Sequence, residues 1–285
     1  MYEKWKGVHT RCAFNMIQEL IPLTRPRTLA AALGPTILGA AFSYYAFGAA
    51  QGTGLAILHT VLIFLAVVTA QIVANLWNEY KDFKSGLDAG QKVGNAGSIT
   101  RGVITPELII TMIKVLMFVP IIIGLYLSAT ITWYYIPVGF LCILISFLYS
   151  GGPKPISRTP FGEISSGIAM GFAIVLITGY AWIRELSLAL LIPAIPSTLL
   201  VGSIMLTNNI RDIRNDESHG RHTLPIVLGR ERALSLMSIS YIFNFIWIIA
   251  WIIVGHMTWF TLLAFLAAPL AFKTIHTLST NTDEF

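Results

Sequence analysis

Long apolar stretches alternate with short polar ones along the whole chain. Most of these stretches run for about twenty residues with few charged side chains, which is the length that an α-helix needs to cross a bilayer. We interpret them as eight transmembrane spans, at residues 28–48, 57–77, 108–127, 132–149, 163–183, 188–207, 233–254 and 258–276. The pattern predicts an all-α, polytopic transmembrane helical bundle that forms a single domain over residues 1–285.

The composition agrees with a membrane protein. Hydrophobic residues make up 55% of the chain and charged residues only 12%, about half the charged fraction of soluble domains. One large helical core in water is the alternative, but so many long uncharged stretches favour spans. The net charge of +5 follows the loops, so it indicates membrane topology and no nucleic-acid partner.

The distribution of basic residues predicts the orientation. They gather in the N-terminal segment and in the connections after the second, fourth and sixth spans, whereas the opposite loops hold only Arg184. Basic loops usually lie on the cytoplasmic side. We therefore expect a multi-pass protein of the cell (plasma) membrane, with the N-terminus and the long loops 78–107 and 208–232 in the cytoplasm.

Each of these two long loops begins with a polar stripe that continues from the preceding span. In the first, helical spacing places on one face Gln71, Asn75, Asn78 and Asp82. In the second, one helical face likewise holds Asn208, Asp212 and Asp216. Both stripes contain Asn-x-x-x-Asp, which hints at two related halves.

Carboxylate and amide oxygens in these stripes suit Mg²⁺, which binds through one or two carboxylates together with substrate phosphates. Nearby Arg and Lys side chains could hold the phosphate oxygens. A single acidic cluster at the end of a span is usually solvated interfacial charge, but two matched clusters that reach into spans favour function. The residues thus indicate metal-assisted chemistry on a phosphorylated lipid at the cytoplasmic membrane face.

Four segments resemble a known family. NEYKDFKSGLD and NNIRDIRNDESHGRHTLPIVLG are similar to the two Asp-rich motifs of the UbiA superfamily of intramembrane aromatic prenyltransferases. TRPRTLAAALGPTILG and YSGGPKPISRTPFGE resemble its opening segment and its inner loop after the fourth span. The likeness is greatest to the menaquinone (MenA) branch and covers nearly the whole chain in order.

The resemblance implies a helical bundle around a central cavity that the two long loops cap. It implies transfer of a polyprenyl group from polyprenyl diphosphate to an aromatic acceptor, 1,4-dihydroxy-2-naphthoate, with loss of CO₂ and diphosphate. The product would be demethylmenaquinone. The expected cofactor is Mg²⁺, and membrane lipid would surround the bundle.

The resemblance also implies roles for individual residues. The expected Mg²⁺ ligands are Asp82, Asp88, Asp212 and Asp216, and the expected catalytic residues are Asp82, Asp212 and Asn78. Diphosphate is expected to contact Asn78, Asn208, Asn209, Arg211, Arg221, one or both of Arg25 and Arg27, and one or both of Lys154 and Arg158. Further candidates are Asn75, Glu79 and Tyr149.

Two departures from the family pattern stand out, at Glu79 and in the number of spans, and the position of Asp88 is a further point. Glu79 occupies a position where many relatives have Asp, so direct metal binding there is in doubt. Asp88 follows Asp82 by six residues rather than four, and a spacing of six is usual in this branch. The placement of Asp88 depends on a turn at Gly86. The family usually has nine spans, so a ninth helix either follows residue 285 or is lacking in this member.

Other functions fit parts of the pattern. A related enzyme could use another acceptor, such as homogentisate, 4-hydroxybenzoate or a glycerol-phosphate lipid. A cation-binding transporter would more naturally place its ionisable residues near mid-membrane. A non-catalytic membrane scaffold would leave the paired Asn-Asp stripes unexplained.

Overall fold

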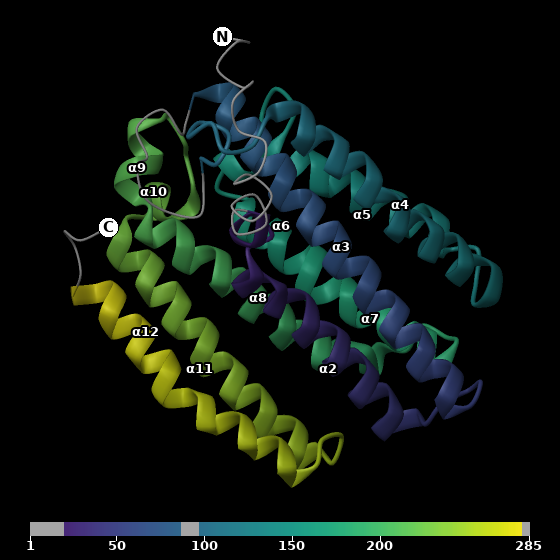
Figure 1. The fold of residues 1–285 in the computed structure, drawn as a ribbon. Coiled ribbons are helices and arrows are strands. Elements are labelled where there is room, and N and C mark those ends of the chain that lie inside the picture. Colours follow the sequence, from purple (N-terminus) through teal and green to yellow (C-terminus); the bar gives the residue numbers. More distant parts are fainter. Residues whose placement is uncertain (1–19, 87–96, 281–285) are drawn as a thin grey trace. The chain divides into compact units, whose positions relative to one another are not determined.

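A computed structural model describes residues 20–86 and 97–280, apart from the side chain of Arg27. Throughout these residues the regular secondary structure is helical and no strand occurs, which confirms the predicted fold class (Figure 1). Asp88 lies outside the described residues. Gly86, the last residue before that gap, has a φ of 73°, so α3 (Thr53–Ser85) ends at a left-handed glycine as the sequence suggested.

Seven helical runs in the described part of the chain are long and apolar enough to cross a membrane. They are α2 (Ala30–Phe47), α3, α4 (Pro106–Thr130), α6–η4–α7 (Gly162–Ile183), η5–α8 (Leu188–Arg211), α11 (Arg230–Val254) and η6–α12 (Trp259–Thr280). An eighth apolar helix, α5 (Tyr135–Ser150), has 16 residues. Every predicted span coincides with one of these helices, and the number that crosses the bilayer stays a prediction.

Contacts within the chain divide it into two compact units. The first comprises residues 1–30 and 65–151, and the second comprises residues 31–64 and 152–285. The boundary falls inside α3, whose 33 residues form one continuous helix. Each unit carries one Asn-x-x-x-Asp motif, and the single-domain organisation stays a prediction.

The first unit has its core where the second half of α3 meets α4. Buried side chains from these elements and from the segment before α4 pack together, among them Val73, Leu76, Ile104, Ile109 and Ile113. Thr105 caps α4, because its Oγ1 accepts a hydrogen bond of 3.2 Å from the backbone N–H of Leu108, and Pro106 follows at the first helical position. A capping threonine followed by proline is a typical helix start.

The length of α3 accounts for its charged end. A helix of 33 residues is roughly 50 Å long, whereas the hydrocarbon core of a bilayer is about 30 Å thick. The helix therefore exceeds the apolar layer by several turns. Its last turns, which carry NEYKDFKS, are free to project into the interface or the cytoplasm.

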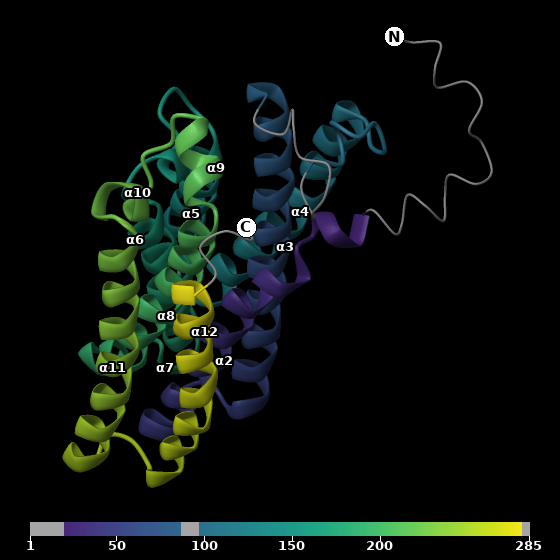
Figure 2. The same cartoon turned by 90° about the vertical axis from the view of Figure 1, so that its left-hand side faces the viewer.

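In the second unit, α8 (Leu191–Arg211) packs against η4 (Gly167–Phe172). It also packs against α11 (Figure 2). The backbones of η4 and α8 approach so closely that a Cβ at Gly171 would lie 2.6 Å from the carbonyl oxygen of Ser197. A Cβ at Gly167 would lie 2.6 Å from the carbonyl oxygen of Thr198. η4 is a π-helical turn, a local widening that often occurs near functional sites.

A tryptophan joins α11 to α8. Pro196 has no backbone N–H, so the carbonyl of Ile192, four residues earlier in α8, lacks its usual helical partner. The indole Nε1 of Trp247 donates a hydrogen bond of 2.8 Å to that carbonyl oxygen. Pro196 thus frees the carbonyl acceptor that Trp247 uses.

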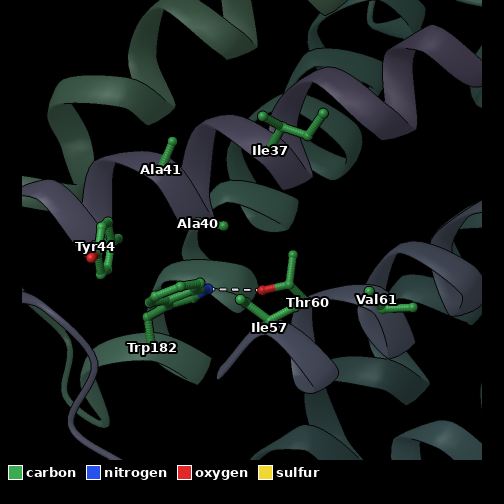
Figure 3. Close-up of a pocket in the computed structure, with 8 residues that line it drawn as sticks. All are labelled: Ile37, Ala40, Ala41, Tyr44, Ile57, Thr60, Val61 and Trp182. Carbon is green, nitrogen blue, oxygen red and sulfur yellow. Dashed lines mark hydrogen bonds between the residues drawn. The ribbon is translucent and has the colours of Figure 1, made fainter. Parts of the chain in front are cut away.

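α2, the start of α3 and α7 (Ala173–Ile183) line an open apolar pocket of about 280 Å³ in the second unit (Figure 3). Its lining consists of Ile37, Ala40, Ala41, Tyr44, Ile57, Thr60, Val61 and Trp182. The indole Nε1 of Trp182 donates a hydrogen bond of 2.8 Å to Thr60 Oγ1, so these two lining side chains satisfy each other. The remaining surface suits hydrocarbon.

Candidate functional site

The first motif occupies the last turns of α3. Asn78 and Asp82 are half-buried and lie one helical turn apart on the same face, as the spacing predicts. Their side chains offer amide and carboxylate oxygens, which are hard ligands for a divalent cation. Glu79, between them in the sequence, is 2% exposed and belongs to a different environment.

Glu79 holds the backbone of the segment that leads into α4. Its Oε2 accepts a hydrogen bond of 3.1 Å from the N–H of Gly97, and its Oε1 accepts one of 3.4 Å from the N–H of Ile99. Both residues are buried. The doubt about direct metal binding at Glu79 therefore gains a physical reason, because both carboxylate oxygens already bind the protein backbone.

Asn75 is also engaged by the protein. Its Nδ2 donates a hydrogen bond of 2.9 Å to the carbonyl oxygen of Thr24 and a longer one of 3.5 Å to Thr28 Oγ1. Thr28 Oγ1 in turn donates to the carbonyl oxygen of Arg25 at 2.8 Å. Arg25 has a φ of 49°, which is uncommon for a residue with a side chain. Asn75 thus fixes the turn that carries Arg25.

The YSGG segment begins beside the first motif. The indole Nε1 of Trp77 donates a hydrogen bond of 3.0 Å to the carbonyl oxygen of Phe147, and the Lys81 ammonium lies 5.0 Å from the centre of the Trp77 ring. Tyr149 follows at the end of α5 and is half-buried. These contacts bring Tyr149 into the unit that contains Asn78 and Asp82.

The second motif crosses the end of α8. The helix ends at Arg211, Asp212 has φ −95° and ψ 10°, and α9 (Ile213–Ser218) follows at once. The predicted continuous helical stripe is therefore wrong in detail, since the helix is interrupted at Asp212. The one-turn spacing nevertheless persists, because the N–H of Asp212 donates to Asn208 O at 3.0 Å and that of Asp216 to Asp212 O at 2.9 Å.

Arg211 and Asp212 form a bidentate ion pair. Arg211 Nε donates to Asp212 Oδ1 and Arg211 Nη2 donates to Asp212 Oδ2, both at 2.9 Å. The two side chains are 45% and 42% exposed. Exposed ion pairs contribute little to stability, so this pair can separate at small cost when either partner meets a ligand.

Asp216 is 3% exposed and pairs with Arg221, whose Nη1 lies 3.2 Å from Asp216 Oδ1. A turn at Gly220, with a φ of 68°, brings the arginine back toward the aspartate. The N–H of His222 then donates to the carbonyl oxygen of Arg158 at 3.0 Å. The structure thus brings together the predicted residues Asp216 and Arg221 and the backbone of Arg158, whereas Lys154 is exposed.

Glu163, in the first turn of α6 (Gly162–Ser166), escaped the sequence analysis. It is 4% exposed, and its Oε1 accepts a hydrogen bond of 2.8 Å from Asn209 Nδ2. It also lies within electrostatic range of Asp216. Glu163 is the last residue of YSGGPKPISRTPFGE. An acidic residue in the first turn of a helix is usually explained by the helix dipole, so the sequence contains no separate indication of a functional role for Glu163.

The oxygen donors of both motifs fit Mg²⁺. Within residues 20–86 and 97–280, no group of three His, Cys, Asp or Glu side chains forms a ready metal cage. Mg²⁺ does not require one, because it commonly keeps several waters and binds one or two carboxylates plus substrate phosphates. Asn78, Asp82, Asn208, Asp212 and Asp216 supply donors of this type.

These features define a membrane-spanning enzyme class, which the comparison with known proteins identifies. The chain belongs to the UbiA prenyltransferase family, whose model matches residues 32–284. The fold agrees, since a UbiA homolog from Archaeoglobus fulgidus bound to DMAPP and Mg²⁺ superposes with a TM-score of 0.66 at 17% identity. That match covers 93% of this chain and 88% of the other.

Two curated relatives carry a more specific name. The chain is 36% identical to 1,4-dihydroxy-2-naphthoate octaprenyltransferase of Bacillus subtilis, over 90% of this chain and 80% of the relative. It is 30% identical to the protein of the same name from Mycobacterium tuberculosis, over 87% of this chain and 82% of the relative. The predicted family and branch are confirmed.

Proposed function

We propose that this chain transfers a polyprenyl group from polyprenyl diphosphate to 1,4-dihydroxy-2-naphthoate. Diphosphate and CO₂ are released, and demethylmenaquinone forms in its hydroquinone state. The observation that carries this proposal is the 36% identity, over 90% of the chain, to a relative named for that acceptor. The oxygen-rich motifs and the apolar helices supply the two chemistries that a prenyl diphosphate needs.

The acidic residues act on the diphosphate through Mg²⁺. Mg²⁺ would be held by Asp82, Asp212 and Asp216, with Asp88 as the further expected ligand. Asn78 and Asn208 or Asn209 would assist. Bound there, Mg²⁺ supplies positive charge that neutralises the diphosphate and helps it to leave. The matched Asn-x-x-x-Asp spacing of the two motifs supports a joint role.

The basic residues hold diphosphate oxygens. Arg211 forms a bidentate pair with its exposed neighbour Asp212 at 2.9 Å, and such a pair separates at small cost. Arg211 can therefore turn to a diphosphate oxygen, which leaves the Asp212 carboxylate available to the cation. Further contacts are assigned to Arg221, Arg25 or Arg27, and Lys154 or Arg158.

In the reaction, two carbon atoms exchange one bonding partner each: the allylic carbon of the prenyl diphosphate and the ring carbon that carries the carboxylate. The bond between the allylic carbon and the diphosphate oxygen breaks, and both electrons leave with the diphosphate. The ring carbon that carries the carboxylate forms a new bond to the allylic carbon. The bond to the carboxylate then breaks, CO₂ leaves, and the freed electron pair restores the aromatic ring.

We place this chemistry at the cytoplasmic face of the plasma membrane. The helices long and apolar enough to span a bilayer make the chain a multi-pass membrane protein. The basic residues of the loops favour a cytoplasmic position for the N-terminus and both motifs.

The test uses the purified chain in detergent micelles with one polyprenyl diphosphate and Mg²⁺. We expect prenylated product with 1,4-dihydroxy-2-naphthoate and none with homogentisate or 4-hydroxybenzoate. Asp82→Ala and Asp212→Ala should each abolish turnover, whereas Glu217→Ala, which removes an exposed carboxylate from α9, should not. Prenylation of another acceptor instead would overturn the acceptor assignment, and full activity in both Asp variants would overturn the metal assignment.

A further inference from the structure

Glu163 is a buried carboxylate that the transfer reaction described above does not use. Only 4% of the residue is exposed. One of its oxygens, Oε1, accepts a hydrogen bond from Asn209 Nδ2 at 2.8 Å. The other, Oε2, has no hydrogen-bond partner among the described residues. A charged group is costly to bury in this way, which makes Glu163 a candidate for a role in the site.

The packing of α6 and η4 against α8 fixes Glu163 relative to Asn209. Gly167 and Gly171 let the two backbones approach, since a Cβ at either position would lie 2.6 Å from α8 backbone atoms. Closer to the motif, a Cβ at Gly202 would lie 3.4 Å from the Glu163 carbonyl oxygen. Gly202 and Asn209 are two helical turns apart on the same face of α8. The contact therefore follows from the rigid core of the second unit rather than from a loop.

The carboxylate determines which way the Asn209 amide points. A glutamate carboxylate only accepts hydrogen bonds, so it must face the NH₂ group of the amide and not its oxygen. The Oδ1 of Asn209 is consequently turned away from Glu163. An amide whose NH₂ group is held in this way presents its oxygen in one direction without the entropy loss of ordering it on binding.

We propose that Glu163 is a positioning residue that orients the Asn209 amide so that its Oδ1 serves the Mg²⁺-diphosphate site of the second motif. The inference rests on the proposed function, because it takes the cation and the diphosphate from it. It adds a residue to the site and gives Asn209 a defined role. Hydrogen-bonded partners of metal-site groups typically change metal affinity by 10- to 100-fold when they are removed.

The test measures cation binding rather than turnover. Mn²⁺ replaces Mg²⁺ and its free fraction is followed by electron paramagnetic resonance, with an unreactive prenyl thiodiphosphate present. We expect Glu163→Ala to weaken Mn²⁺ binding by about tenfold, and Asn209→Ala to weaken it similarly. The double variant should be no worse than either single variant, because Glu163 acts through Asn209. Glu217→Ala, which removes an exposed carboxylate nearby, serves as the matched control.

Glu163→Gln separates positioning from charge. A glutamine can still accept from the Asn209 NH₂ group, although it also allows the reversed pairing, so Mn²⁺ affinity should lie between those of the wild type and Glu163→Ala. It also keeps the shape of the side chain, which covers the case that Glu163→Ala fails to fold. Unchanged binding in Glu163→Gln and Glu163→Ala, or additive losses in the double variant, would overturn the positioning role.

Failure of the proposed function has a different signature. If the wild type prenylates an acceptor other than 1,4-dihydroxy-2-naphthoate while Glu163→Ala still weakens Mn²⁺ binding, the acceptor assignment falls and the positioning role stands. If the wild type turns over 1,4-dihydroxy-2-naphthoate and Glu163→Ala binds Mn²⁺ as tightly, the positioning role falls and the function stands.

Discussion

Glu79→Ala removes the acceptor of two buried backbone hydrogen bonds. Glu79 receives the N–H of Gly97 at 3.1 Å and that of Ile99 at 3.4 Å, and it is only 2% exposed itself. An alanine leaves both N–H groups without a partner, at about 1–3 kcal/mol for each buried group. We take about 2–4 kcal/mol for the pair, because the 3.4 Å bond is the weaker one.

Hydrogen exchange followed by mass spectrometry measures this loss in detergent micelles. Since each 1.4 kcal/mol corresponds to a factor of ten, exchange of the Gly97 and Ile99 amides should accelerate roughly 30- to 700-fold. Glu107→Ala is the matched control, because Glu107 is an exposed carboxylate in the first turn of α4. It should leave these two amides unchanged.

Glu79→Asp distinguishes the backbone role from direct metal binding. The shorter side chain cannot span both N–H groups, so exchange at Gly97 or Ile99 should still rise. If Glu79 instead served as a cation ligand, Glu79→Asp should keep the Mg²⁺ dependence, because a carboxylate remains at the position. Unchanged exchange in Glu79→Ala together with loss of Mg²⁺ dependence would refute the reasoning.

Two further predictions concern the packing around α8. Trp247→Phe deletes the donor to the Ile192 carbonyl oxygen, a bond of 2.8 Å, and should lower the unfolding free energy by about 1–2 kcal/mol; an unchanged thermal unfolding midpoint would contradict this. Gly171→Ala places a Cβ 2.6 Å from α8 backbone and should lower the midpoint strongly. Gly124→Ala, with nothing within 4 Å, should not, and equal midpoints in the two variants would refute the close-packing explanation.

Much of the fold could be predicted from the sequence because membranes impose a simple rule. A helix must bury about twenty residues in hydrocarbon, so all eight predicted spans coincide with helices. The polar stripe at the end of α3 was predictable for a second reason. Helical periodicity places Asn78 and Asp82 on one face whatever they contact.

The partners of polar residues could not be predicted in this way. Asn75 shares the spacing of the stripe, but its amide binds the backbone of Thr24, 51 residues away. Glu163 and Asn209 are 46 residues apart, and they meet because η4 and α8 pack closely. Periodicity gives the face on which a side chain lies, whereas tertiary packing determines what that face meets.

The interruption at Asp212 has a comparable cause. The sequence around Asp212 has the spacing of a continuous helix, yet the backbone departs from helical angles there and α9 begins anew. Asp is a modest helix former. Asp212 pairs with Arg211 on one side of the break, and Asp216 contacts Arg221 on the other side. The Asp216–Arg221 contact depends on the turn at Gly220, which periodicity does not encode.

The most direct test of the central claim is a label on the acceptor. The purified chain is supplied with polyprenyl diphosphate, Mg²⁺ and 1,4-dihydroxy-2-naphthoate that carries ¹³C in its carboxyl group, and the products are analysed by mass spectrometry. We predict that ¹³CO₂ and diphosphate appear in equal amounts and that the prenylated ring lacks the label. A prenylated product that keeps the label, or diphosphate release without ¹³CO₂, would contradict the account.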